Sequence, residues 1–402
     1  MSGSAIVQPE AALTSRTSAT RVITLVGSIL ALGYLVILGG AFFGGNFLID
    51  ARGEPIANDF VNVWAAGRLA LEDHAAAAYD WTLHKAAEVR AVGHDFANYY
   101  GWHYPPTFLF VAAALATLPY LASALLWLLA TLALYAAALG KILGGRAGAA
   151  LALGFPAALW NITAGQNGFL TAALIGGTLC FLERRPALAG LCLGLLTYKP
   201  QFGLLFPLVL IADRRWRTIV VAAAVALVLA ALSWLVFGAA SWVAFVQGLS
   251  ATSRVVLGEG GADFNRLQSV FGLVRAHGGS EMLAWSLQGA AALAAAVALV
   301  VLWRSRATFE LKAAALVCGA LLATPYVYMY DLVVLAVAVA FLLRDGVQRG
   351  FSRADGVALT AAAVLILVYP YAPTQVGLVA VLIVAALAGF RACCIATRTA
   401  SD

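Results

Sequence analysis

The stretch from Val22 to Phe43 reads VITLVGSILALGYLVILGGAFF and contains no charged residue. About 20 consecutive apolar residues are enough for an α-helix to cross a lipid bilayer, so we expect a membrane helix here. Arg16 and Arg21 precede it, and no small-residue cleavage site clearly follows. We therefore interpret the segment as a retained first helix and not as a removed signal peptide.

The composition of the whole chain agrees with this start. Of the 402 residues, 63% are hydrophobic and 11% are charged, whereas an average soluble domain carries about 25% charged residues. This balance excludes a soluble enzyme, a disordered protein, a collagen-like fibre and a disulfide-stapled secreted domain. The apolar runs are continuous and do not alternate, which excludes a β-barrel. The sequence thus predicts an all-α polytopic membrane protein, with residues 1–402 as one integral membrane domain.

Polar breaks between the apolar runs are of two alternating kinds. The N-terminus and the basic breaks together hold 17 of the 25 Lys and Arg residues. The basic breaks are Lys141 to Arg146, Arg184-Arg185, Arg214 to Arg217, Arg304 to Lys312, Arg344 to Arg353 and the C-terminal tail. Cytoplasmic loops carry an excess of Lys and Arg, so this pattern predicts about twelve membrane helices with both termini in the cytoplasm. The net charge of +6 is explained by these basic cytoplasmic loops, so no nucleic-acid partner is expected.

Two long loops are predicted on the outer side, at residues 46–120 and 239–281. The first holds more than a third of the acidic residues of the chain and four of its five histidines, together with many aromatic residues. Such a concentration favours a functional site over a linker. Aromatic residues at this level are also ordinary membrane-interface anchors, which is the alternative interpretation.

Lys199 is the most informative single residue. It separates two apolar segments, Pro186 to Tyr198 and Gln201 to Asp213. At about 1.5 Å per residue, roughly 13 residues cannot cross a hydrocarbon core of about 30 Å. Irregular backbone at membrane depth is tolerated beside protein or a water-filled cavity, so we expect the break to line a cavity. A lysine there suits a phosphate group, and the alternative is a side chain that extends to the outer interface.

Asp59 follows the first membrane helix and is flanked by apolar and aromatic residues. A carboxylate in such surroundings can have a raised pKa and act as a base. An Asp before an apolar run is also a common helix N-cap, which is the competing interpretation. His103 could bind a phosphate or a hydroxyl, although Pro105-Pro106 beside it is an ordinary helix start.

Three further segments lie at outer helix junctions. Gly165-Gln166-Asn167 is either a polar turn or part of the site. Arg266 in the second long loop could pair with an anionic lipid head group. Tyr330 and Asp331 suit sugar recognition, although tyrosines here also fit an aromatic belt.

Several other motifs are absent. The sequence contains no GxxxxGK[ST], HExxH, GxSxG or DxD pattern. Its five cysteines show no metal-ligand spacing, so no disulfide framework and no zinc site is expected. No cofactor is expected, and no ligand cluster argues for a divalent ion, although the need for one stays open. The GxxxG pairs Gly40–Gly44 and Gly190–Gly194 predict close helix packing.

Taken in order, several of these segments resemble glycosyltransferase family 87, the polyprenol-phosphate-mannose-dependent mannosyltransferases of the GT-C fold. The matching pieces are Asp59-Phe60, Trp64-Ala65-Ala66-Gly67, Tyr79-Asp80, Tyr104-Pro105-Pro106, Leu118-Pro119, Gly165-Gln166-Asn167, Lys199-Pro200-Gln201, Gln268-Ser269 and Thr324-Pro325. Enzymes of that fold similarly have juxtamembrane helices in the first outer loop and an acidic catalytic residue after the first membrane helix.

The resemblance implies a reaction and a place for it. Asp59 would be the general base in a single inverting displacement from a polyprenyl-phosphate-sugar donor to a lipid or glycan acceptor. The protein would lie among the lipids of the bacterial inner membrane, with its active site extracytoplasmic. From charge and position, Lys199, Arg266 and His103 would bind the donor phosphate. Sugar and acceptor hydroxyls would be bound by Gln166, Gln201, Tyr104, Tyr330 and Asp331.

Mannose is the expected sugar, but the segment after Thr324-Pro325 departs from the family. Mannosyltransferases of this family carry a Trp and histidines there, whereas this chain has Tyr326 to Asp331. Arabinofuranose or another hexose therefore stays open. The competing function is a secondary transporter or a flippase of lipid-linked sugars, because short Pro-broken helices also suit transporters. An O-antigen ligase or polymerase is a third interpretation, for which more arginine would be expected in the outer loops.

Overall fold

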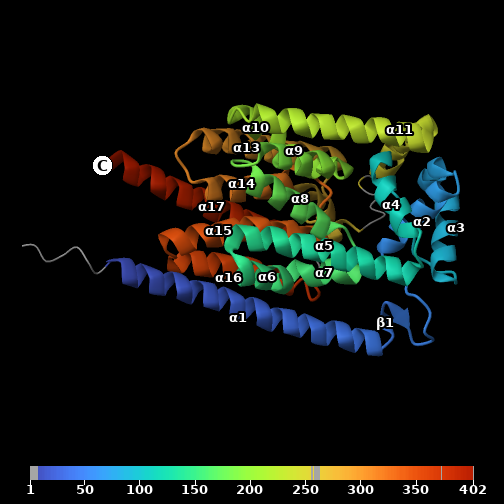
Figure 1. Ribbon diagram of the computed structural model, residues 1–402, viewed down its shortest axis with the longest axis horizontal. Coiled ribbons are helices and arrows are strands. Elements are labelled where there is room, and N and C mark those ends of the chain that lie inside the picture. The colour runs from blue at the N-terminus through green and yellow to red at the C-terminus, as the bar shows by residue number, and fades with distance from the viewer. Residues whose placement is uncertain (1–7, 255–256, 258–262, 373, 402) are drawn as a thin grey trace, which may run out of the picture.

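The chain forms a bundle of long, nearly parallel helices with shorter helices lying across one end (Figure 1). A computed structural model describes residues 8–254, 257, 263–372 and 374–401. The N-terminal end of α1 and the C-terminal end of α17 lie at the left end of the bundle in Figure 1, and α2 and α3 lie at the right end.

The helices differ widely in length. The long ones are α1 (Gln8–Phe43), α5 (Tyr120–Leu143), α11 (Trp216–Ser253), α13 (Glu281–Arg304) and α17 (Val376–Ser401). The shorter ones inside the bundle are α6 (Gly145–Gly154), α7 (Pro156–Ala164), α8 (Gly168–Phe181), α9 (Pro186–Leu195), α10 (Phe206–Ala212), α14 (Phe309–Ala323), α15 (Leu335–Arg349) and α16 (Arg353–Leu367). Three short 3-10 helices interrupt it: η3 (Leu196–Tyr198), η4 (Pro200–Phe202) and η7 (Met329–Val334).

Two outer segments complete the fold. The first contains the hairpin β1 (Asn46–Phe47) and β2 (Ile49–Asp50), then α2 (Phe60–Leu71), η1 (Ala75–Tyr79), α3 (Trp81–Val92), η2 (Pro106–Phe108) and α4 (Leu109–Ala116). The second contains η6 (Phe264–Arg266) and α12 (Val270–Ala276). The loop predicted to start at residue 239 begins as helix, because α11 continues beyond a kink at Gly238 to Ser253. Residues 255–256 and 258–262 of that loop lie outside the described residues.

Long apolar helices support a multi-pass membrane protein. Among the described residues, five helices are long and apolar enough to cross a membrane, and six are if the bent pair α6 and α7 forms one span. Polar and proline breaks shorten the other apolar helices. Examples are the 59° bend at Pro156, the break at Lys199-Pro200 and the end of α14 at Thr324. The expected total of about twelve spans therefore depends on these shorter helices and stays a prediction.

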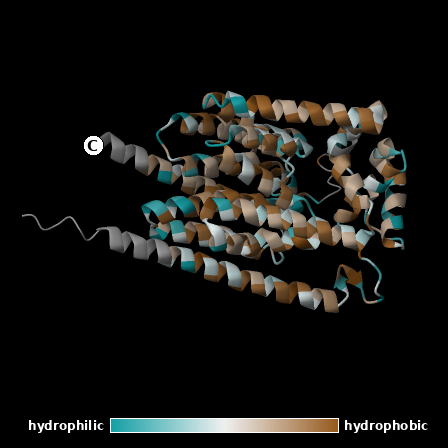
Figure 2. Cartoon of the chain, viewed as in Figure 1, coloured by the Kyte–Doolittle hydropathy of each residue, from teal (hydrophilic) through white to brown (hydrophobic). Residues whose placement is uncertain are grey.

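The sides of the long helices present apolar side chains outward. Leu227 and Leu235 on α11 and Leu35 on α1 are each at least two-thirds exposed. Figure 2 shows these helices as largely hydrophobic along their length, with hydrophilic residues toward the ends of the bundle. A soluble monomer rarely exposes continuous apolar surface of this extent, and lipid is its natural cover.

Close helix packing occurs at one of the two GxxxG pairs. A Cβ atom placed on Gly190 or Gly194 would clash with Val221 and Val225 of α11, so both glycines let α9 approach that helix closely. The prediction for this pair is confirmed. It is wrong for the other pair, because a Cβ on Gly40 would meet nothing within 4 Å.

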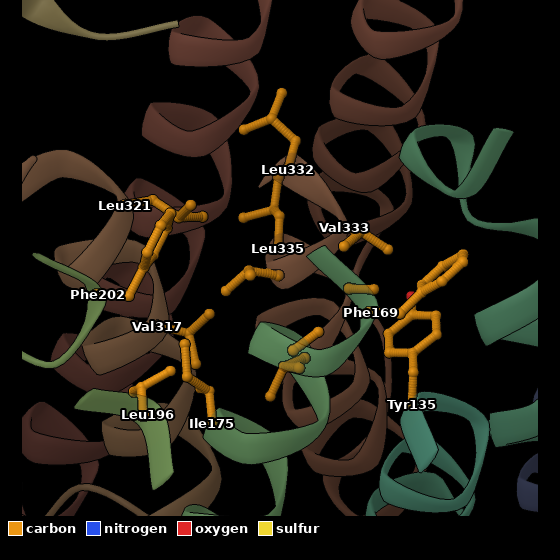
Figure 3. Packing of buried hydrophobic residues seen from close by; sticks show 14 of the residues in the cluster. Tyr135, Phe169, Ile175, Leu196, Phe202, Val317, Leu321, Leu332, Val333 and Leu335 are labelled. Carbon is orange, nitrogen blue, oxygen red and sulfur yellow. The ribbon is translucent and has the colours of Figure 1, made fainter. Parts of the chain in front are cut away.

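A buried apolar core lies between the central helices (Figure 3). It joins Tyr135 of α5 and Phe169 of α8 to Val317 of α14, with Phe202 of η4 and Leu332 of η7 in the same cluster. The last two residues belong to the short segments that also carry Lys199 and Asp331. The core therefore fixes the backbone on which these charged residues lie.

Ion pairs join the predicted cytoplasmic ends of four helices. Arg391 of α17 contacts Asp345 of α15 at 2.8 Å and Asp355 of α16 at 2.6 Å, and Arg344 contacts Glu310 of α14 at 3.3 Å. Several of the basic breaks of the sequence thus gather at one end of the bundle. The side of the membrane on which this end lies stays a prediction.

Candidate active site

Asp59 stands immediately before α2, but it does not cap that helix. Its backbone is already helical, with φ −56° and ψ −23°, and its side chain accepts no hydrogen bond from the first turn. Asn58 does so instead, because its Oδ1 accepts from the backbone N–H of Phe60 at 3.0 Å. The carboxylate of Asp59 is therefore available for a role other than N-capping.

The carboxylate of Asp59 is oriented by a residue far away in the sequence. Gln166 Nε2 donates to Asp59 Oδ2 at 3.0 Å. Gln166 is itself held by Tyr104, whose hydroxyl donates to Gln166 Oε1 at 3.4 Å and accepts from Asn167 Nδ2 at 2.6 Å. Gln166, Asn167 and Tyr104 are all buried. This hydrogen-bonded chain fixes one oxygen of Asp59 and leaves the other for a substrate.

Gly165 makes this contact possible. It ends α7 with φ +68°, a left-handed conformation that glycine adopts without steric cost. A Cβ atom there would lie 2.8 Å from Asn58 Oδ1 and 2.9 Å from Phe60 Cβ. The turn that carries Gln166 therefore packs directly against the backbone that carries Asp59.

We expect Gly165→Ala to lower the rate of any reaction that uses Asp59 by at least tenfold. A methyl group at this position would strain the backbone and push the turn away from Asn58, which would lengthen the bond between Gln166 and Asp59. Steady-state rates of the folded variant check this. Gly144→Ala is a matched control, since Gly144 also has positive φ (101°) but a methyl group there would meet nothing within 4 Å. Equal loss in both variants would contradict the proposed contact.

Lys199 is buried and forms an ion pair with Asp331. Its Nζ lies 2.6 Å from Asp331 Oδ1, and the two side chains are 9% and 2% exposed. Asp331 Oδ2 accepts from the backbone N–H of Tyr328 at 3.1 Å. The rings of Phe202 and Tyr330 have centroids 5.4 and 5.7 Å from the ammonium. Lys199 does not extend to the outer interface, and its charge is balanced within the protein.

Arg266 supplies a second cation to the site. It lies at the end of η6, its side chain is exposed, and no ion pair joins it to an acid among the described residues. Its backbone is held by Gln268, whose Nε2 donates to Arg266 O at 3.3 Å and whose Oε1 accepts from Gly377 N at 2.9 Å. The guanidinium is close enough to Asp59 to act on it electrostatically.

Burial dominates the acid–base behaviour of Asp59. It raises the pKa of the carboxyl group from 3.8 to about 6, because a desolvated carboxylate is disfavoured. The hydrogen bond from Gln166 and the charges of Arg266 and Lys199 act in the opposite direction, and the charge of Asp331 raises the pKa further. A carboxyl group with this pKa is largely ionised at pH 7 and can accept a proton.

The structure brings most of the predicted residues together. Hydrogen bonds connect Asp59, Gln166 and Tyr104. Lys199 contacts Asp331 through the ion pair and Tyr330 through its ring. Electrostatic interactions link Asp59 to Arg266, Lys199 and Asp331. Gln201 lies in η4, and among the described residues no hydrogen bond connects it to this group. His103 is exposed beside Gly101, whereas its neighbour Tyr104 is buried.

Two residues of the site had been given no role of their own in the sequence analysis. Asn167 holds the hydroxyl of Tyr104, and Tyr198 pairs with Thr171 at 2.6 Å and donates to Asn167 O at 3.2 Å. Both adjoin residues that were predicted, Gln166 and Lys199. The short polar motifs at Gln166 and Lys199 therefore also indicated these two residues, because each motif contributes more than one side chain to the site. Among the described residues, no group of three or more His, Cys, Asp or Glu side chains could hold a metal ion.

Comparison with known proteins supports the assignment that this geometry suggests. The family model of glycosyltransferase family 87 matches residues 102–325, which is more than half of the chain. The matched region includes Tyr104, Gln166, Lys199 and Arg266, whereas Asp59 and Asp331 lie outside it. No curated protein and no solved structure matches the chain. Because the family model covers more than half of the chain, this protein belongs to glycosyltransferase family 87, whose members are membrane glycosyltransferases.

Proposed function

We propose that this protein transfers a hexose, with mannose as the first candidate, from a polyprenyl-phosphate donor to a lipid or glycan acceptor. The transfer takes place on the extracytoplasmic face of the bacterial inner membrane and inverts the anomeric configuration. Both termini lie in the cytoplasm, at the end of the bundle where the basic breaks gather.

One observation carries this proposal. Asp59 holds a partly buried carboxylate that does not cap its helix, that is oriented by Gln166 at 3.0 Å, and whose pKa is about 6. The guanidinium of Arg266, which has no acidic partner in the described part of the chain, acts on the same carboxylate. A base beside a cation is the arrangement that an acceptor hydroxyl and an anionic leaving group require.

The chemical step is one displacement at the anomeric carbon. The acceptor oxygen forms a bond to that carbon as the bond from the carbon to the phosphate oxygen breaks, and the acceptor proton moves to Asp59. The leaving group departs as a polyprenyl phosphate with one more negative charge. Arg266 is the principal residue that stabilises this charge, with Lys199 and His103 as secondary candidates. Tyr104, Gln166, Gln201, Tyr330 and Asp331 are proposed to bind hydroxyl groups of the sugar or acceptor.

We expect Arg266→Gln to weaken donor binding by roughly tenfold or more, because a hydrogen-bonded charge pair with the phosphate is lost. Donor affinity measured in nanodiscs checks this. Arg52→Gln removes an equal charge from the exposed turn that follows the β1–β2 hairpin and should leave donor affinity unchanged. Equal donor affinities in the wild type and the Arg266 variant would remove Arg266 from the phosphate site.

The rate should depend on pH through Asp59. The ionised form is the base, so kcat/KM is expected to fall tenfold per pH unit below about pH 6 and to level off above about pH 7. A pH profile measured with a neutral acceptor checks this. The same acidic limb in the residual activity of Asp59→Asn would assign it to another group.

The transfer itself can be tested with purified protein in nanodiscs. Radiolabelled polyprenyl-phosphate-mannose is incubated with a membrane lipid extract, beside matched donors that carry arabinofuranose or glucose. We expect label to move into a new lipid or glycan with the mannose or the glucose donor, and the product identifies the acceptor. Transfer from the arabinofuranose donor alone would keep the transferase and replace the hexose. Intact donors in every incubation would overturn the proposal.

The family match favours a transferase over a transporter or flippase, which remains the second candidate. A flippase would move the labelled donor between the two leaflets without consuming it. Nanodiscs expose both leaflets, so sealed vesicles are used for this comparison. Movement of intact donor with no labelled product would support the flippase.

A further inference from the structure

A small surface pocket lies behind the segment that carries Asp59. It has a volume of about 210 Å³ and is lined by Asp50, Ala57, His94, Phe96, Asn98 and Tyr100, among others. Ala57 is two residues from Asp59, and two residues of extended chain span at most about 7 Å. Tyr100 is also close enough to Asp59 for the two to interact electrostatically. The pocket therefore adjoins the proposed base.

The pocket is built onto the backbone that positions Asp59. The hydroxyl of Tyr100 donates to Ala57 O at 3.3 Å and accepts from Asn98 Nδ2 at 3.4 Å. Tyr120 of α5 donates to Ile56 O at 3.2 Å from the other side. A ligand in this pocket would thus be held at a fixed distance from the carboxylate of Asp59.

The polar groups of the pocket suit a neutral hydroxylated ligand. Asp50 Oδ1 accepts from the backbone N–H groups of Glu54 and Arg52, which lowers the pKa of this carboxyl group and keeps it ionised. Its second oxygen accepts no hydrogen bond among the described residues and is free for a hydroxyl donor. Both ring nitrogens of His94 lie 3.1 Å from backbone carbonyls, of Asp95 and Pro55, which raises the pKa of His94 and favours the imidazolium. Asp50 and His94 carry opposite charges, and the ammonium of Lys85 beside Phe96 pairs with Glu88 at 3.9 Å, so these charges are matched and do not favour a phosphate.

Two aromatic rings supply the apolar part. Phe96 and Tyr100 have ring centroids 6.1 Å apart and both line the pocket; Lys85 Nζ covers one face of the Phe96 ring, 3.1 Å from its centroid, so a sugar would contact the other face or the edge. A sugar ring presents hydroxyl groups at its edge and C–H groups on its faces, which matches rings beside a carboxylate and an amide. At about 30 Å³ per water molecule, the volume corresponds to roughly seven waters, the scale of one sugar ring and not of a lipid chain.

A larger cavity, of about 360 Å³, lies at the other end of α2 between Arg68, Arg90 and Leu118. Both arginines pair with Glu72, at 3.1 and 3.2 Å, and stand in the last turns of α2 and α3. Positive charge at these positions complements the helix dipoles. The fold accounts for those charges, so they do not point to a ligand.

We infer that the pocket lined by Asp50, Phe96, Asn98 and Tyr100 binds a neutral sugar residue of the acceptor, next to the sugar whose hydroxyl is glycosylated at Asp59. The preferred acceptor is then a glycan or glycolipid with at least two sugar residues at its end. This inference rests on the proposed function and specifies the acceptor that the reaction uses.

The test compares two synthetic acceptors, octyl mannoside and octyl dimannoside, with the donor found active in the transfer assay. In the wild type, KM is expected to be about tenfold lower for the dimannoside. Asp50→Asn keeps the Oδ1 that accepts the backbone bonds and replaces the free oxygen with an amide nitrogen. It should raise KM for the dimannoside about tenfold and leave kcat, donor KM and the mannoside KM unchanged. Asn98→Ala should act in the same direction, and Asn46→Ala on β1, outside the pocket, should have no effect.

A measurement of dimannoside binding without turnover separates the proposed pocket from the proposed transfer reaction. Titration calorimetry of dimannoside into the Asp59→Asn variant measures the pocket without turnover, and Asp50→Asn in that background should weaken binding about tenfold. Binding that depends on Asp50 without sugar transfer would remove the proposed reaction and keep the pocket. Equal KM values for the two acceptors, or dimannoside binding that is indifferent to Asp50, would overturn the pocket and leave the transferase standing.

Discussion

Asp59→Asn is expected to lower the rate of sugar transfer by about 10²- to 10⁴-fold, the range that a positioned general base contributes. Asparagine keeps an oxygen that can accept from Gln166, so the side chain stays in place while its capacity to take a proton is lost. Donor affinity should change little, because Arg266 and Lys199 are untouched. Transfer rates and donor binding measured on the same nanodisc preparation check both statements.

The same substitution should not weaken the fold. The pKa of Asp59 is raised in the folded protein, so its ionisation stabilises the unfolded state, and this effect is fully present above about pH 6. Replacing the carboxylate with a neutral amide removes that cost. The thermal midpoint of Asp59→Asn at pH 7.5 should therefore equal or exceed that of the wild type. An inactive variant with a lower midpoint would point to misfolding and not to a lost base.

Asp80→Asn is the matched control. Asp80 also precedes a helix in the first outer segment, but it does cap its helix, since Oδ1 accepts from Thr82 N and Leu83 N at 2.9 Å. Asparagine is an equally good N-cap, so stability and activity should both stay near the wild-type values. Near-normal transfer by Asp59→Asn would exclude Asp59 as the base.

The second large effect is expected at the ion pair of Lys199 and Asp331. Lys199→Met leaves a carboxylate buried without its partner, and Asp331→Asn leaves a buried ammonium. Breaking such a pair from one side costs about 3–5 kcal/mol, because the remaining charge is desolvated and unpaired. Both single variants should therefore lose several degrees of thermal midpoint and much of their folded yield.

The double variant Lys199→Met/Asp331→Asn separates stability from function. It contains neither buried charge, so most of the lost stability should return. Donor affinity should remain below the wild-type value, since an ammonium near the phosphate is missing. Glu72→Gln is the control, because it breaks the surface pairs with Arg68 at 3.1 Å and Arg90 at 3.2 Å, each of which is worth at most about 1 kcal/mol. A double variant as unstable as the sum of the single variants would show that the two charges do not stabilise each other.

The sequence was sufficient to predict the features that depend on local composition. A run such as Val22 to Phe43 must be helical in a bilayer, because every backbone polar group there has to be satisfied within the segment. A proline next to a lysine has to interrupt an apolar helix, and the break at Lys199-Pro200 is where it was predicted. The positions of the basic breaks between the apolar runs could likewise be read from the distribution of Lys and Arg along the chain. The packing of Gly190 and Gly194 was predicted from their spacing, but the same spacing at Gly40 and Gly44 gave a wrong prediction, since a pattern does not show which face meets a neighbour.

The partners of the polar side chains were decided by the tertiary structure. Gln166 reaches Asp59 across 107 positions of the sequence, and Asp331 reaches Lys199 across 132. From its local sequence Asp59 looks like an N-cap, and only the helical backbone at Asp59 and the packing of Gly165 against Asn58 direct its carboxylate elsewhere. Lys199 was predicted to bind a phosphate or to extend to the outer interface, and the core that carries η4 and η7 brings a carboxylate to it. Residue types and spacing define what each group can do, whereas the choice of partner depends on packing between distant segments, for which a single sequence contains no local signal.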